Sequence, residues 1–182
     1  MTQSNGERAG TIEVQVDRVV QLFDTLDPFP FGERDLDKEA EEYILSWARE
    51  LPKRGAIKIV VHLPAQEAAS ESARDIAKAF DRHFKDRADV TGSDLKELFR
   101  LGRFSLVIGI SVLALCIAAS QILSRTFANT DIARFLSEGL IILGWVANWR
   151  PIEIFLYEWW PLVRRRRLYR RLAAADVVLL PK

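Results

Sequence analysis

The sequence has one cysteine and two histidines among its 182 residues. A lone cysteine cannot form an internal disulfide, and Cys116 lies in an apolar run, so it is predicted to be a small packing residue. His62 and His83 are not at a spacing typical of metal ligands. Neither a glycine-rich dinucleotide motif nor a P-loop occurs. We therefore expect no cofactor, no metal site and no catalytic residue, and a protein that is not an enzyme.

A strong net charge is also missing, since the formal net charge is +1 at pH 7. The charges are nevertheless uneven. Acidic residues gather between Glu33 and Glu42, which we expect to form a solvated face, and six arginines lie between residues 164 and 171. This basic block follows an apolar run and is not interleaved with aromatic residues over a broad face. That arrangement favours anionic lipid headgroups and argues against a nucleic-acid partner.

No charged residue occurs from Phe104 to Leu123, and these 20 residues match the length needed to cross a bilayer core. A second apolar stretch begins after Glu138 and ends at the arginine block. Residues 94–163 are therefore predicted to form a transmembrane hairpin. The positive-inside rule places both termini in the cytoplasm, because basic residues concentrate at the inner ends of the spans, at Lys96, Arg100, Arg103 and Arg164 to Arg171.

The remaining sequence carries the periodicities of strands and helices. Residues 11–18 alternate apolar and polar side chains, residues 34–51 have an apolar stripe, and residues 56–63 are rich in β-branched side chains. This order predicts a parallel βαβ unit. A second helix is expected over residues 66–88, followed by a break at 89–93, and residues 176–180 are expected to return as a third strand.

The expected fold class is therefore α+β. Residues 11–93 form a small cytoplasmic α/β domain of about three strands and two helices, standing on the two-helix transmembrane hairpin. Residues 1–10 are polar, lack the apolar segment of a secretory signal and are predicted to be a disordered tail. Residues 164–182 combine a basic anchor with the returning strand.

Polar side chains interrupt the second apolar stretch, at Asn148, Arg150, Glu153 and Tyr157. Arg150 and Glu153 are three residues apart, so they can pair on one helix face. We expect the pair to clamp the hairpin or a subunit contact, and the alternative is an ion or proton path through an oligomer. Two depths are possible. A kinked span of residues 139–162, which we slightly prefer, places Arg150 near mid-membrane, whereas a span of 132–149 places it at the inner interface.

Small residues recur at three- and four-residue steps and are predicted to allow close helix approach. This helix-packing seam consists of Gly102, Ser105, Gly109, Cys116 and, on the second span, Gly144. The expected lipid-headgroup anchor consists of Arg164, Arg165, Arg166 and Arg167 with Trp159 and Trp160. Phe29 and Phe31 are large rings in a proline-containing loop, and either cap the domain core or form a docking surface for a partner.

A family of small bacterial inner-membrane proteins of uncharacterised function resembles this chain in the run GWVANWRPIEIFLYEWWP, which starts at Gly144, and in the RRRRLYRRL that follows. The segments ERDLDKEAEEYILSWARELP and IVVHLP are similar to the soluble part of that family. The resemblance implies two membrane helices and a cytoplasmic α/β part, with no known activity.

We thus expect a two-pass inner-membrane scaffold whose cytoplasmic domain docks a second copy or another protein. The alternatives are a subunit of an oligomeric ion channel or transport accessory that uses Arg150 and Glu153, and, third, an enzyme acting on a lipid-proximal substrate.

Overall fold

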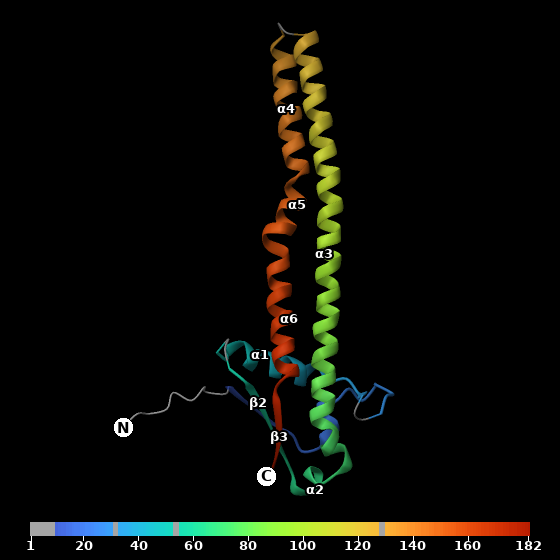
Figure 1. Cartoon of the computed structure of the whole chain (residues 1–182), viewed down its shortest axis with the longest axis vertical. Helices are drawn as coiled ribbons and strands as arrows, with labels where there is room; N and C mark the ends of the chain where they lie inside the picture. The colour runs from blue at the N-terminus through green and yellow to red at the C-terminus, as the bar shows by residue number, and fades with distance from the viewer. Residues whose placement is uncertain (1–9, 31–32, 53–54, 128–129) are drawn as a thin grey trace, which may run out of the picture. The chain divides into compact units, whose positions relative to one another are not determined.

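The structure, a computed structural model, describes residues 10–30, 33–52, 55–127 and 130–182 (Figure 1). The chain divides into two compact units. The first consists of Met1–Thr91 with Arg164–Lys182, and the second of Gly92–Val163. The first unit is an α+β domain and the second is a helical hairpin, and each is described by itself below.

A three-stranded parallel sheet lies at the centre of the first unit. β1 (Gly10–Gln15) and β3 (Asp176–Pro181) each pair in parallel with β2 (Ile57–Leu63), so the strand order is β1-β2-β3 (Figure 1). Ile12 of β1 lies beside Ile59 of β2, which lies beside Val177 of β3. The predicted parallel unit and the returning C-terminal strand are confirmed.

The helices differ in extent from the prediction. The structure contains the 3₁₀ turn η1 (Val19–Leu22), α1 (Lys38–Glu50), the short α2 (Ala65–Ala68), α3 (Glu71–Thr126), α4 (Asp131–Ala147), α5 (Trp149–Glu153), the π-helical turn η3 (Ile154–Glu158) and α6 (Trp159–Ala173). α1 begins later than residue 34 because the Asp37 carboxylate caps it by accepting the Glu39 N–H at 2.9 Å.

The predicted break at residues 89–93 is wrong. α3 continues through Gly92, and a glycine inside a helix costs only about 1 kcal/mol relative to alanine. Thr91 stays compatible with the helix because its hydroxyl donates to the Arg87 carbonyl one turn earlier, at 2.8 Å. The signal that Asp94 starts a new helix therefore falls inside a longer one.

The core of the first unit lies on one face of the sheet. Alternate residues of the strands, among them Ile12 and Ile59, are buried there with Ile44 of α1. Aromatic rings complete the packing, since the Phe84 ring lies between those of Phe80 and Tyr169, with centroids 6.1 and 6.3 Å away. Two rings predicted for the buried stripe of α1 are instead half exposed, at Tyr43 and Trp47.

The opposite face of the sheet follows from the topology. The order β1-β2-β3 moves across the sheet in one direction, and parallel crossovers are right-handed, so both connections place their helices on the same face. We call the other surface the open face. It consists of Thr11, Glu13, Gln15, Lys58, Val60, His62, Asp176, Val178 and Leu180. Within the described residues, Val60, Val178 and Leu180 all lie outside the core cluster.

The second unit contains the apolar parts of two long helices. The helical segments Ser72–Thr126 and Asp131–Ala173 are each long and apolar enough to cross a membrane. Only 17% and 22% of their most apolar windows are buried within the structure, whereas a core helix of a soluble protein is mostly buried. Their apolar side chains therefore face outward from the hairpin.

Candidate functional site

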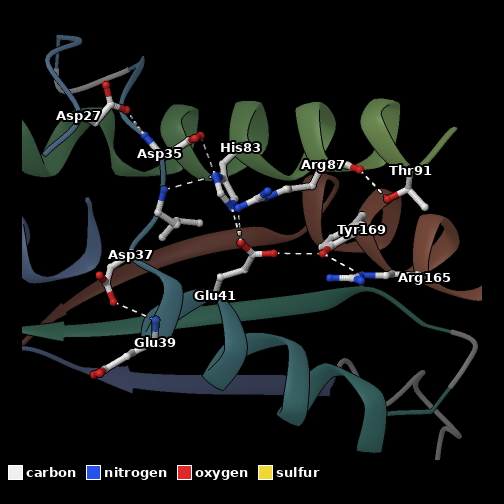
Figure 2. Close-up of polar contacts among 11 residues, drawn as sticks. Asp27, Asp35, Asp37, Glu39, Glu41, His83, Arg87, Thr91, Arg165 and Tyr169 are labelled. Carbon is white, nitrogen blue, oxygen red and sulfur yellow. Dashed lines mark hydrogen bonds and ion pairs between the residues drawn. The ribbon is translucent and has the colours of Figure 1, made fainter. Parts of the chain in front are cut away.

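A buried polar cluster joins three helices of the first unit (Figure 2). Glu41 of α1 is at its centre, and we call it the Glu41 cluster. His83 Nε2 lies 3.3 Å from Glu41 Oε2, and the Arg87 guanidinium contacts the same oxygen at 2.9 Å. The Tyr169 hydroxyl, from α6, donates to Glu41 Oε1 at 3.1 Å. Both carboxylate oxygens therefore have donors.

These contacts change the acidity of Glu41. The hydrogen bond from His83 is the largest influence and, with the positive charge of Arg87 and the Tyr169 hydroxyl, lowers the pKa of Glu41 from 4.5 to about 2. Burial acts in the opposite direction and is outweighed. Glu41 is therefore an ionised carboxylate near neutral pH, although its side chain is only 9% exposed.

His83 also connects the cluster to the loop before α1. Its Nδ1 lies 3.0 Å from Asp35 Oδ1 and 3.3 Å from the Leu36 N–H. A neutral ring accepts the Leu36 N–H at Nδ1, whereas a doubly protonated ring donates to Asp35. The ring is buried, with 1% of its side chain exposed. His83 thus holds the loop against α3 through either form.

The same loop has an internal turn that exposes apolar side chains. The Asp27 carboxylate accepts the N–H groups of Asp35 at 2.8 Å and Phe29 at 3.0 Å, and these bonds lower the pKa of Asp27. Leu26 is 89% and Phe29 is 59% exposed. Phe29 is therefore too exposed to cap the core of the domain. Its predicted companion, Phe31, lies outside the described residues.

The sequence prediction missed this cluster. We expected the acidic stretch to form a solvated face, and that is wrong for Glu41, which is buried. A signal was present, because Glu41 shares the three- and four-residue spacing of the buried Ile44 and Ala48. Both oxygens of the carboxylate are bonded to side chains of other helices, so the cluster ties α1, α3 and α6 together. The described residues include no group of three or more side chains suited to hold a metal.

A second polar site lies between the two arms of the hairpin. The Asn148 side-chain amide donates to the carbonyls of Gly109 on α3 and Gly144 on α4, each at 3.0 Å. Asn148 follows the last residue of α4, where its own N–H bonds to Trp145 O at 3.0 Å. The side chain therefore satisfies the Gly144 carbonyl, which the Asn148 N–H would bond in an uninterrupted helix.

Proline explains why the helix is interrupted at this point. Pro151 has no N–H to donate to the Ala147 carbonyl, and it lies in the first turn of α5, where proline is tolerated. The chain then passes through the π-helical turn η3. The regular helix is therefore interrupted between α4 and α5, and Asn148 lies at the interruption as a contact between the arms.

The predicted helix-packing seam does contain close contacts between the two arms. A β-carbon at Gly109 would lie 2.7 Å from Asn148 Oδ1, one at Gly102 would lie 2.9 Å from Ile154, and one at Gly144 would lie 2.7 Å from Leu113. Cys116 is buried, as a packing residue should be. Ser105 is only partly buried.

A hydroxyl pair extends this contact toward the loop. Ser120 and Ser137 are hydrogen-bonded to each other across the arms, and both are buried. We did not predict this pair, because serine is common in such helices and its partner depends on how the arms are aligned.

The charges of the second span form a surface cluster. Arg150 is hydrogen-bonded to Glu158 and also reaches Glu153 at 3.1 Å. The Arg150 side chain is 59% exposed within the structure. The predicted pairing with Glu153 is therefore present, and Glu158 is an additional partner. Tyr157 is 69% exposed, and none of its described side-chain atoms joins this cluster.

The arginines of the predicted lipid anchor have different environments. Arg165 Nε donates to the Tyr169 hydroxyl at 3.1 Å, and Arg166 is partly buried, with an Nε that has no partner among the described atoms. Arg164 and Arg167 are exposed. In the second unit, Trp160 is exposed and Trp159 donates to the Phe155 carbonyl at 2.8 Å.

Comparison with known proteins adds no functional assignment. No protein-family model, curated protein or solved structure matches this chain.

Proposed function

We propose that this chain is a two-pass protein of the bacterial inner membrane whose cytoplasmic domain is an interaction module. The observation that carries the proposal is the open face of a purely parallel sheet. Such sheets occur almost entirely with both faces covered, and here the described helices cover one. A small domain of this kind, attached to helices long enough to span a bilayer, is suited to hold a partner at the membrane surface.

The hairpin contacts support a shallow position for Arg150. Because Asn148 lies level with Gly109 in the antiparallel arm, Arg150 lies near the level of residue 107. That level is four residues, or about 6 Å, from Arg103. The Arg150 side chain reaches toward Glu158, in the direction of α6 and its arginines. These contacts favour the span of residues 132–149, with Arg150 reaching the inner interface.

Arginine exposure also refines the proposed lipid contact. Arg164, Arg165 and Arg167 are the exposed arginines of the anchor, but the Arg165 guanidinium is also bonded to Tyr169. We propose that Arg164 and Arg167 bind anionic headgroups at the cytoplasmic surface. The R164Q/R167Q double variant should then weaken retention of phosphatidylglycerol on the purified protein. R74Q, an exposed arginine on α3, is the matched control.

Membrane attachment is tested directly by carbonate extraction, which should leave the protein in the membrane pellet. Release into the supernatant would overturn the proposal. Orientation is tested in a C116A background, where the chain has no other cysteine. T126C, at the exposed last residue of α3, should react with a membrane-impermeant maleimide added outside intact spheroplasts. K182C should react only after lysis, and the reverse pattern would contradict cytoplasmic termini.

The channel alternative has less support. The contact between the arms is filled by Asn148 and small residues, and the Arg150 cluster lies on the surface of the hairpin. A conducting path would have to form between several copies. Ion flux through reconstituted liposomes that is lost in R150L would favour this alternative.

A further inference from the structure

We infer that the open face of the sheet is covered by the same face of a second copy of this chain. The inference rests on the proposed function, because it names the partner of that interaction module. The face has an apolar part and a charged part. Val60, Val178 and Leu180 form the apolar part; Val60 is 6% exposed, Val178 is partly buried and Leu180 is 43% exposed. A parallel sheet with no layer of secondary structure over one face is rare.

The edges of the sheet do not offer an equivalent site. Gly10 and Val16 donate their N–H groups toward β2, so the alternate residues of β1 direct theirs outward. On that outer edge, the Glu13 carbonyl accepts the Tyr43 hydroxyl at 3.3 Å. On the other edge, Lys182 donates toward β2, so Pro181 occupies an outward position, where it has no N–H to offer. Each edge therefore has fewer backbone groups available to pair with an added strand. We accordingly place the contact on the face of the sheet.

The size of the face favours a partner confined to the same membrane. Six residues and three strands give a footprint of roughly 300 Å², whereas stable complexes bury about 800 Å² per partner. A contact this small holds only at a high effective concentration. A second copy meets that condition, because its own hairpin places it in the same bilayer.

The chemistry of the face is compatible with self-association. Both signs of charge are present on the face, since Lys58 is positive and Glu13 and Asp176 are negative, so copies do not meet as two surfaces of one sign. The Glu13 carboxylate lies 3.6 Å from His62 Nε2 on the same face. Two-fold pairing is the commonest symmetry of homo-oligomers, and it needs one surface that matches itself.

Cysteine cross-linking in native membranes tests the inference. In a C116A background, H62C lies on β2, at the middle of the face. Copper-phenanthroline oxidation should give a disulfide-linked dimer of H62C. The exposed controls A77C on α3 and E42C on α1 should give none. L180D added to H62C should lower the dimer yield about tenfold or more, because it places like charges opposite each other. A77D added to H62C should not change the yield.

Two results would overturn the inference. In one, H62C stays monomeric on oxidation while it reacts freely with maleimide, so the face is uncovered. In the other, H62C is protected from maleimide or linked to a different protein, and no dimer forms. Carbonate extraction of the same membranes distinguishes failure of this inference from failure of the proposed function. If the protein stays in the pellet and H62C is linked to a different protein, the proposed function stands and only self-association is contradicted.

Discussion

His83 Nε2 lies 3.3 Å from Glu41 Oε2, and this buried contact joins α3 to α1 (Figure 2). Because Tyr169 binds the other oxygen of the same carboxylate, α6 is joined to both. α6 immediately precedes β3, so Glu41 helps to hold the segment that returns to the sheet. The stability of the first unit should therefore depend on the charge of one carboxylate.

The first prediction concerns pH. The pKa of Glu41 is about 2 in the folded chain and 4.5 ordinarily, so the unfolded state binds the proton more readily. Stability from this group is fully present above pH 4.5 and is lost as the pH falls from 4.5 toward 2. The full loss is about 3 kcal/mol, of which about 2 kcal/mol is lost by pH 3. Thermal unfolding of the full chain in non-ionic detergent, followed by circular dichroism between pH 7 and pH 3, measures this larger part.

Glu42 provides the control for this prediction. It is exposed on the same helix, so E42Q should keep the acid-dependent fall in melting temperature. E41Q should be less stable at pH 7 and should show a shallower fall on acidification. An E41Q variant with the same pH dependence as the unmodified protein would show that Glu41 is not the responsible group.

A second prediction concerns the Tyr169 hydroxyl. Y169F removes the bond to Glu41 and the bond from Arg165, but keeps the ring stacked on Phe84. A buried charged acceptor that loses a donor costs roughly 1–3 kcal/mol, and the melting temperature should fall accordingly. Y157F is the control, because Tyr157 is 69% exposed and its hydroxyl makes no bond to the described residues. Equal melting temperatures for Y169F and Y157F would contradict a role for the hydroxyl.

The sheet was predictable because local patterns determine it. The alternation over β1 follows from one buried face, and the β-branched run of β2 is typical of a central strand. The third strand could be assigned because residues 177–180 are apolar and return after a hairpin. The uncovered face was not predicted, since it depends on strand order and on the handedness of two crossovers.

The candidate sites were less predictable. Polar residues at 148, 150 and 153 stand out in an apolar run, so they could be identified from the sequence. Their partners could not, because the contact of Asn148 with Gly109 depends on the alignment of two arms separated by a loop. The burial of Glu41 was not predictable for the same reason. It depends on His83 and Tyr169, which are 42 and 128 residues away along the chain.

A third prediction concerns the Asn148 amide. N148L leaves the carbonyls of Gly109 and Gly144 without that donor, and interhelical bonds of this kind contribute about 0.6 to 2 kcal/mol in membranes. The double variant S120C/S137C in a C116A background reports on the arms, because these two side chains are bonded across them. N148L should lower the yield of the intramolecular disulfide. N148Q, which keeps the amide, should restore part of it.

The fourth prediction tests the close approach at Gly109. A β-carbon there would lie 2.7 Å from Asn148 Oδ1 and 3.1 Å from the Ala147 carbonyl, and the second contact is with backbone that cannot rotate away. G109L should therefore separate the arms and lower both the melting temperature and the S120C/S137C disulfide yield. Gly139 is the matched control, because a β-carbon there meets nothing within 4 Å, so G139L should leave both unchanged. If both variants behave like the parent, the arms do not need glycine at this contact, and the seam would be a consequence of composition.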